Sequence, residues 1–226
     1  MKLNVRTLLE FFDEAPVSSQ GHATALCAVI GEDLGAATFK HYFEKKNAKV
    51  RILAERPKPG RKKGQRLDRW IEVVEPAGNG FYYQTEIKSW SAHAIGSASI
   101  PIDATSDQIS LHRMKLWKSI WEIEQNQPND DSMRKVLLPM PRPLNSNPGF
   151  VVRPLLIFWY LLHPVGQLET FFVQPLGQNV SKVFDQLYIF SVSSYLRSLT
   201  IKEIDLDMPD SIVRMRWLKK IISDEN

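Results

Sequence analysis

The sequence predicts an α/β protein whose core runs helix, three strands, helix, strand, followed by a C-terminal α+β extension. Three observations predict it: a long helical pattern at residues 22–45, strand-like runs between residues 49 and 90, and a second helical pattern at 107–125. Of 226 residues, 43% are hydrophobic and 24% are charged. Those proportions are typical of globular proteins and exclude the disordered and fibrous classes.

The helices are predicted from apolar residues that recur at helical spacing. A short helix is expected at residues 5–13. Within the longer pattern at 22–45, Gly31 marks a point at which the segment can divide into two helices. The apolar face of the helix at 107–125 is expected to comprise Leu111, Met114, Leu116, Trp117, Ile120 and Trp121.

Strands are predicted where β-branched and aromatic residues dominate, at residues 49–54, 67–74 and 81–90. A basic loop separates the first two, and the turn Pro76–Gly80 separates the last two. A fourth strand is expected at residues 135–139. It would complete a core domain within residues 1–140.

Residues 141–226 form the predicted extension, packed on the core. It opens with the Pro/Asn-rich segment Pro141–Pro148 and closes with a basic amphipathic helix at about 209–222. We interpret that helix as a surface helix rather than a partner- or nucleic-acid-binding one. The strand-like runs of the extension lie at 152–162, 169–174, 186–192 and 201–206. Its aromatic clusters favour the core of a second sheet, with base stacking as the alternative.

The sequence favours a cytoplasmic protein without a membrane span. Its single cysteine, Cys27, cannot form an internal disulfide, and its first residues lack the pattern of a signal peptide. The most apolar run, Pro154–Pro164, is about half the roughly 20 residues that a transmembrane helix needs.

The basic loop is the first candidate for contact with a partner. The formal net charge is only +4, but five cations cluster between the first two predicted strands: Lys58, Arg61, Lys62, Lys63 and Arg66. Such a loop suits contact with nucleic-acid phosphates, which need positive charge without exact geometry. A solvated hairpin tip is the alternative interpretation.

The residues with the clearest chemistry lie on the second and third predicted strands. Gln84, Glu86 and Lys88 project from one side of a strand, because side chains alternate between faces. Asp68 opens the neighbouring strand, which can bring its carboxylate beside Glu86. Two close carboxylates repel each other unless a cation lies between them, and Mg²⁺ prefers such oxygen ligands. A nearby lysine can orient a water molecule or neutralise charge on a phosphoryl group.

Asp at the start of the second strand and Glu-x-Lys on the third resemble the PD-(D/E)xK nuclease superfamily, with its restriction-endonuclease-like αβββαβ core. The resemblance covers about residues 22–140 and departs from the motif at Leu67, where the name-giving proline would stand. It implies that Asp68 and Glu86 bind a metal ion and that Lys88 is the catalytic lysine.

The resemblance also suggests roles for two further side chains and for the whole protein. Glu32 would match an additional metal-binding acid on the preceding helix, and Gln84 would position substrate or water. The implied activity is hydrolysis of DNA phosphodiester bonds by an endonuclease that uses Mg²⁺, with Mn²⁺ able to substitute. The alternative is a non-catalytic DNA-binding or assembly subunit with the same fold. A second copy or a partner protein could dock through the C-terminal block.

Other interpretations of these residues stay open in the sequence. Asp68 can be a strand-start residue paired with Arg66 or Arg69, and Glu86 and Lys88 can form an ordinary ion pair. Glu72 can replace Asp68 as the acid if the strand begins elsewhere. The five histidines lack zinc-ligand spacing, and motifs of serine hydrolases, P-loop proteins and dinucleotide-binding enzymes are missing.

Overall fold

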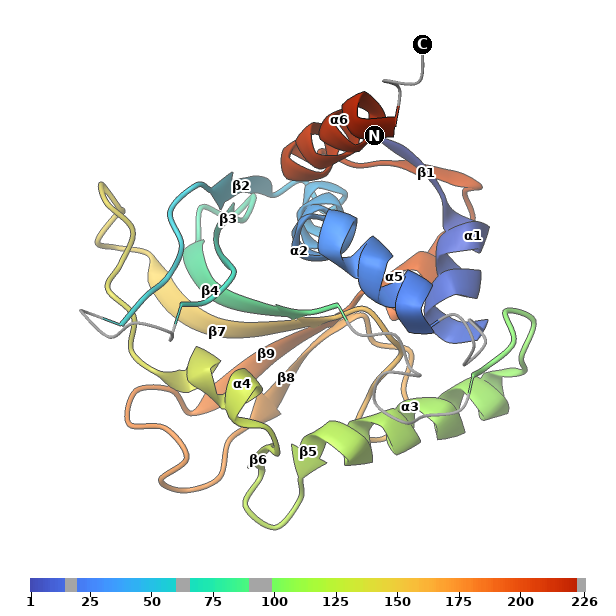
Figure 1. Cartoon of the computed structure of the whole chain (residues 1–226). Helices are drawn as coiled ribbons and strands as arrows, with labels where there is room; N and C mark the ends of the chain where they lie inside the picture. Colours follow the sequence, from blue (N-terminus) through green and yellow to red (C-terminus); the bar gives the residue numbers. More distant parts are fainter. Residues whose placement is uncertain (15–19, 60–65, 90–98, 223–226) are drawn as a thin grey trace.

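The structure, a computed structural model, describes residues 1–14, 20–59, 66–89 and 99–222. Over these residues the protein is mixed α/β, with six α-helices and a six-stranded mixed sheet (Figure 1). No described helix combines the length and the apolar composition that crossing a membrane requires.

The central sheet has the strand order β2-β3-β4-β7-β9-β8. Antiparallel pairs form its two sides, whereas β4, β7 and β9 run parallel at its centre. The strands are β2 (Lys49–Leu53), β3 (Arg69–Val74), β4 (Gly80–Lys88), β7 (Val151–Phe158), β8 (Phe171–Pro175) and β9 (Gln186–Ser191). Every residue of β4 is buried, as expected for a strand covered on both faces.

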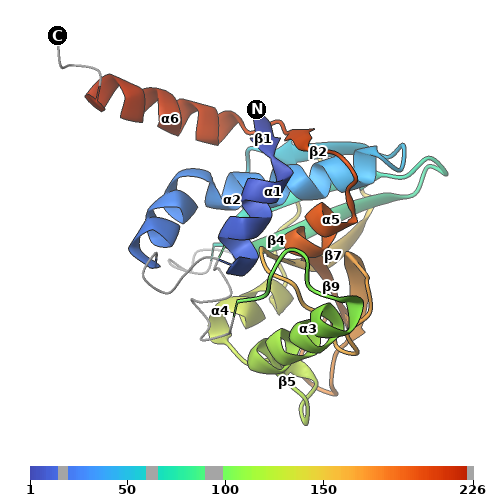
Figure 2. The same ribbon diagram turned by 90° about the vertical axis from the view of Figure 1, so that its right-hand side faces the viewer.

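Helices cover both faces of the sheet (Figures 1 and 2). One apolar core joins α1 (Val5–Leu9), α2 (Gln20–Glu44) and α5 (Val192–Ser198) to one face. A second core joins α3 (Ser106–Ile120) and the segment beginning at α4 (Asp131–Arg134) to the other. The aromatic residues Phe158, Trp159 and Tyr160 are fully buried, which confirms core packing over base stacking. The expected second sheet is wrong, because β7, β8 and β9 belong to the same six-stranded sheet as β2, β3 and β4.

Short elements complete the fold at the edges. A π-helical turn spans Glu10–Glu14 and a 3-10 helix spans Lys135–Leu137. The remaining strands form two small antiparallel pairs: β1 (Lys2–Asn4) with β10 (Glu203–Asp205), and β5 (Trp121–Glu122) with β6 (Gln127–Pro128).

Most predicted elements are confirmed, but the strand expected at residues 135–139 is wrong. Lys135–Leu137 forms the 3-10 helix, with Val136 and Leu137 both buried rather than on opposite faces. Proline at position 139, which has no N–H to donate to a ladder, suits a strand interior poorly. The segment instead packs against the face of the sheet formed by β4 and β7.

The strand that follows α3 in the sheet is β7, from the C-terminal block. It lies parallel to β4, with Glu86 opposite Leu156. The sheet therefore includes strands from both sides of residue 141, where the sequence suggested that the core ends and an extension begins. Gly31 does not interrupt α2, which runs unbroken from Gln20 to Glu44.

The closing helix α6 (Pro209–Ile222) is confirmed in its bounds and projects from the body of the protein (Figure 2). Its first turns are anchored by hydrogen bonds from Ser211 N to Asp33 and from Arg214 to the Val29 carbonyl. Farther along, Trp217 is 60% exposed and Ile221 is 73% exposed. The second half of α6 therefore presents apolar surface to solvent.

Close packing of α2 on β4 fixes the strand that carries Glu86 and Lys88. A Cβ added at Gly35 would lie 2.7 Å from Cγ2 of Ile87. We expect Gly35→Ala to lower the free energy of unfolding by about 1–3 kcal/mol through overpacking. In an open helix position the same change would raise it by roughly 1 kcal/mol. Urea unfolding measures the sign.

The control for Gly35→Ala is the same substitution in an Ile87→Ala background, where the clashing methyl group is gone. There the nearest remaining atom is Cγ2 of Ile157 at 3.3 Å, so the alanine should cost less stability than in the unchanged protein and the two substitutions should be non-additive. Stabilisation by Gly35→Ala in the otherwise unchanged protein would contradict the close contact.

Candidate active site

Backbone pairing at the start of β3 places Asp68 across from Glu86. Asp68 N donates to the Thr85 carbonyl at 3.0 Å, which continues the register in which Arg69 faces Thr85. The Asp68 Oδ2 atom accepts a hydrogen bond from Ile87 N at 2.7 Å. The carboxylate is therefore held at the point where β3 and β4 meet, as the sequence predicted.

Glu86 is a buried carboxylate with two ammonium groups at one oxygen. Its Oε1 atom lies 3.0 Å from Lys88 Nζ and 2.8 Å from Lys135 Nζ. Glu86 and Lys88 are 4% and 5% exposed. They are therefore a buried pair rather than the solvent-facing one considered from the sequence. The Glu86 Oε2 atom is buried and has no hydrogen-bond partner among the described residues.

A residue in the first turn of α4 holds the Lys88 ammonium group in place. Lys88 Nζ donates to Ser132 Oγ at 2.6 Å, and Ser132 N donates to Asp130 Oδ1, also at 2.6 Å. Asp130 is the N-cap of α4, a role in which aspartate satisfies the free N–H groups of the first turn. Ser132 and Lys135 were missed in the sequence because this segment was interpreted as polar loop followed by strand. The Asp130 cap is the signal for the helix that brings them to the site.

Gln84 is fully buried, and its amide is used to hold the backbone of the neighbouring segment. Its Nε2 atom donates to the carbonyl groups of Val136 and Leu138. That pair of bonds fixes the 3-10 helix that carries Lys135. The Gln84 Oε1 atom, also buried, has no hydrogen-bond partner among the described residues.

Burial and the neighbouring Glu86 carboxylate raise the pKa of Asp68 from 3.8 to about 6. Desolvation contributes most, since it disfavours the charged form, and like-charge repulsion from Glu86 follows. The hydrogen bond from Ile87 N and the positive charge of Lys135 act in the opposite direction. The two carboxylates are thus electrostatically coupled, as the sequence predicted for a pair that needs a cation.

In this structure Lys135 supplies positive charge to both carboxylates, through its ion pair with Glu86 and its electrostatic effect on Asp68. The site also offers oxygen atoms of the kind that a hard divalent cation prefers. Asp68 and Glu86 offer carboxylate oxygens, and the Glu86 Oε2 and Gln84 Oε1 atoms are buried acceptors to which no described residue donates. A bound ion would remove the cost of these unsatisfied groups. Among the described residues, no three His, Cys, Asp or Glu side chains are grouped as a preformed metal cluster.

The two other candidate acids lie in separate ion pairs. Glu32 lies on α2, and its Oε2 atom is 2.9 Å from Arg56 Nη2 and 3.5 Å from Arg69 Nη1. Its negative charge nevertheless contributes to the raised pKa of Asp68. Glu72 is bound by two nitrogens of Arg51, at 2.8 and 3.0 Å. The register puts Glu72 opposite Tyr82 rather than Glu86, so Asp68 is the acid that meets Glu86.

The basic loop is described only at its two ends. Lys58 and Arg66 are exposed, whereas Arg61, Lys62 and Lys63 lie outside the described residues. Lys135 Nζ donates to the Arg66 carbonyl at 3.3 Å, so the end of the loop lies next to the Asp68–Glu86 pair.

Comparisons with protein families, with curated proteins and with solved structures find no match for this chain. What the site can do therefore rests on its own geometry. That geometry is a pair of coupled carboxylates, two lysines on one of them, and two buried oxygen acceptors that have no donor in the described part of the chain.

Proposed function

We propose that the protein is a metal-dependent nuclease that hydrolyses DNA phosphodiester bonds, with Asp68, Glu86 and Lys88 at its centre. The observation that carries the proposal is the meeting of these side chains where β3 joins β4. Asp68 and Glu86 are coupled carboxylates, and Lys88 is buried in contact with Glu86. Burying Glu86 and Lys88 beside the half-buried Asp68 is costly, and such clustering of ionisable groups is typical of functional sites.

The order of elements supports the assignment to a restriction-endonuclease-like core. The sequence α2, β2, β3, β4, α3, β7 follows the helix, three strands, helix, strand order of the PD-(D/E)xK superfamily. Glu86 and Lys88 lie on its third strand, and Asp68 immediately precedes its second strand. The sheet continues beyond this unit through β9 and β8.

The proposed chemistry assigns a different task to each side chain. Asp68 and Glu86 would hold Mg²⁺, which when bound acidifies a water molecule and neutralises phosphate charge. Lys88, fixed by Glu86 and Ser132, would hold the attacking water or the oxygen on which charge develops. Gln84 acts through the backbone of Val136 and Leu138 and positions Lys135. Arg66 and Lys58 would contact the DNA backbone.

A cleavage assay on supercoiled and linear DNA tests the proposed function. With Mg²⁺ or Mn²⁺ we expect nicking or linearisation that EDTA abolishes. Asp68→Ala and Glu86→Ala should each remove the activity, while Asp131→Ala, at a 95% exposed carboxylate, should not. Cutting by both site variants at the unchanged rate would refute the assignment of the site.

One observation favours a second function, a non-catalytic DNA-binding subunit. Lys135 Nζ lies 2.8 Å from Glu86 and also acts on Asp68, so the protein itself supplies the cation that two close carboxylates require. In a non-catalytic subunit, the Lys135 ammonium group would permanently occupy the position at which a nuclease binds its metal ion.

Lys135→Met distinguishes the two functions by calorimetry. In a nuclease, the unchanged protein binds Mg²⁺, and Lys135→Met strengthens binding by roughly tenfold because a competing cation is gone. In the non-catalytic subunit, Mg²⁺ binds only after Lys135 is removed. Lys115→Met, at an exposed residue of α3, is the matched control and should leave Mg²⁺ affinity unchanged.

A further inference from the structure

A second candidate site lies away from the carboxylates, in a pocket enclosed by α1, α3 and α5. Its volume is about 860 Å³, within the range of roughly 300–1,000 Å³ in which proteins bind small molecules. None of Asp68, Gln84, Glu86 and Lys88 lines it. It is therefore independent of the proposed nuclease chemistry.

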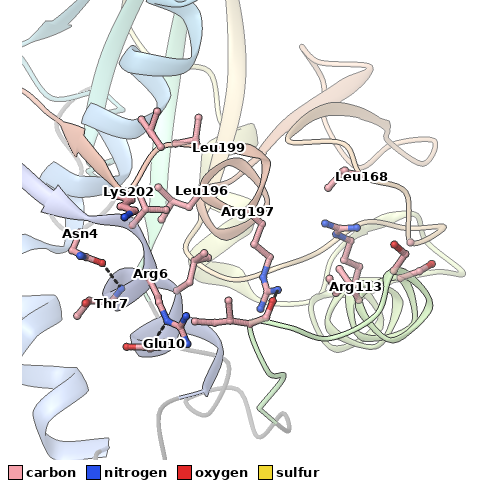
Figure 3. A pocket seen from close by; sticks show the side chains of 18 of the residues that line it. Asn4, Arg6, Thr7, Glu10, Arg113, Leu168, Leu196, Arg197, Leu199 and Lys202 are labelled. Atoms are coloured by element: carbon pink, nitrogen blue, oxygen red, sulfur yellow. Dashed lines mark hydrogen bonds and ion pairs between the residues drawn. The ribbon is translucent and has the colours of Figure 1, made fainter.

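One wall of the pocket is apolar and comes from elements distant in the sequence. Val5 and Leu9 contribute from α1, Ile109 from α3 and Leu196 from α5. Leu168, 65% exposed, stands at another part of the lining (Figure 3). A hydrocarbon group placed here would remove apolar surface from water, which is worth about 25 cal/mol per Å².

A buried guanidinium whose Nε atom is unsatisfied among the described residues is the feature that points to a ligand. Arg113 lines the pocket and is 3% exposed, and its Nε atom has no hydrogen-bond partner among the described residues. Figure 3 shows the side chain rising from α3 into the region between Arg197 and Leu168. Leaving a buried cation with an unmade hydrogen bond is costly, and the acceptor group of a bound ligand would remove that cost.

A second guanidinium, Arg197, reaches the same pocket from α5, and its own bonds are satisfied. It pairs with Asp13 at 2.9 Å and donates to the carbonyl groups of Ile102 and Pro101. Burial and the charge of Arg197 both lower the pKa of Arg113, while the Asp13 carboxylate acts in the opposite direction, as expected where two cations share one nearby acid.

The whole lining has an excess of positive charge. Arg6, Arg113, Arg197 and Lys202 stand against the two acids Glu10 and Asp107. Glu10 is already paired with Arg6 at 3.0 Å. Among the described residues, Arg113 and Lys202 are the lining cations outside an ion pair, and Arg113 is the buried one of the two.

We propose that this pocket binds a small organic anion, an apolar chain or ring that carries one carboxylate or phosphate group, with the anionic group on Arg113 and the apolar part against α1 and α5. Arg197 faces the same group and is held in place by Asp13. Both parts of such a ligand have a counterpart in the pocket: the anionic group accepts a hydrogen bond from the guanidinium, and the hydrocarbon part covers the apolar wall.

Binding is tested by calorimetry on the full chain with four probes: octanoate, octyl phosphate, octan-1-ol and inorganic phosphate. At least one of octanoate and octyl phosphate should bind at least tenfold more tightly than octanol, which lacks the charge, and than inorganic phosphate, which lacks the chain. Which of the two binds better identifies the anionic group. Failure of both to bind would overturn the proposal, and so would octanol or inorganic phosphate binding as tightly as the better of them.

Arg113→Met separates a ligand-binding role from a structural one. It should weaken binding of the preferred probe at least tenfold, and Arg113→Lys should retain part of the affinity. Without ligand, Arg113→Met should melt at the same or a higher temperature, because it removes a buried charge that lacks a hydrogen bond. Arg216→Gln, at an exposed residue of α6, should bind like the unchanged protein. Unaltered affinity in Arg113→Met would overturn the assignment.

Discussion

Lys88→Met is expected to lower the rate of metal-dependent DNA cleavage by about 10²–10³-fold, the typical loss when one preorganised group that stabilises transition-state charge is removed. Lys88 is 5% exposed, and its Nζ atom donates hydrogen bonds to Glu86 Oε1 and Ser132 Oγ. No other group can therefore easily take over its role. The change is measured in single-turnover cleavage of linear DNA with Mg²⁺.

Methionine suits this test because it fills a similar space without the charge. Glu86 keeps Lys135 as a partner at 2.8 Å, so the variant does not leave an isolated buried carboxylate. We therefore expect the circular dichroism spectrum and the DNA affinity of Lys88→Met to match those of the unchanged protein. Cleavage at the unchanged rate would remove Lys88 from the mechanism.

Ser132→Ala offers a milder and more diagnostic change at the same place. It removes the hydroxyl that lies 2.6 Å from Lys88 Nζ but leaves the ammonium group and its contact with Glu86. Because it alters only the positioning of Lys88, we expect a loss smaller than that of Lys88→Met. An equal loss in both variants would indicate that Ser132 has a task of its own.

Asp68→Asn is expected to stabilise the metal-free protein at pH 7 while it removes metal binding. Burial and Glu86 raise the pKa of Asp68 from 3.8 to about 6. At roughly 1.4 kcal/mol per pKa unit, the ionised side chain costs the folded state about 3 kcal/mol at neutral pH. The asparagine oxygen can still accept from Ile87 N, so the substitution removes the charge and keeps the hydrogen bond. Urea unfolding should show a gain of roughly 1–3 kcal/mol.

The pH dependence of this gain follows from the direction of the shift. Between about pH 4 and pH 6 the unfolded chain releases the Asp68 proton while the folded protein keeps it, so stability falls as pH rises through this window. Below pH 4 both states are protonated and the contribution of Asp68 vanishes. The advantage of Asp68→Asn should therefore be large at pH 7 and small at pH 4. An advantage that is equal at both values would contradict the raised pKa.

Mg²⁺ should reverse the order of stability of these two proteins. A metal that binds only the folded state stabilises it, and the carboxylate must first lose its proton. We expect Mg²⁺ to raise the melting temperature of the unchanged protein more at pH 7 than at pH 5, and to leave Asp68→Asn unaffected. Asp131→Asn, at a 95% exposed carboxylate paired with Arg134, is the matched control. It should show neither the gain in stability nor the loss of the metal effect.

Local patterns in the sequence were sufficient for most elements and for the position of the carboxylates. The alternation of β3 and β4 and the turn between them determine which residues face one another across a hairpin. That register is short-range, so Asp68 opposite Glu86 and Lys88 beside Glu86 could be derived from residues only about 20 positions apart. The helical spacing in α2, α3 and α6 likewise reflects which residues are apolar along a single element.

Contacts distant in sequence could not be derived in this way. The parallel pairing of β4 with β7 joins residues about 70 positions apart, and nothing local distinguishes that strand from an element of a separate block. Lys135 and Ser132 reach Glu86 and Lys88 because the segment after α3 folds over the sheet, where Gln84 binds its backbone.

The sequence by itself was enough to place Asp68, Glu86 and Lys88 on one face of the hairpin, because strand periodicity and turn geometry are local properties. Only the tertiary structure decided that Lys135 shares Glu86, that Gln84 holds the Lys135 segment, and that Arg113 is buried in a pocket between α1, α3 and α5. The reason is that burial and ion pairing depend on which distant elements pack together. That choice is made by the whole apolar core and not by any one segment of the chain.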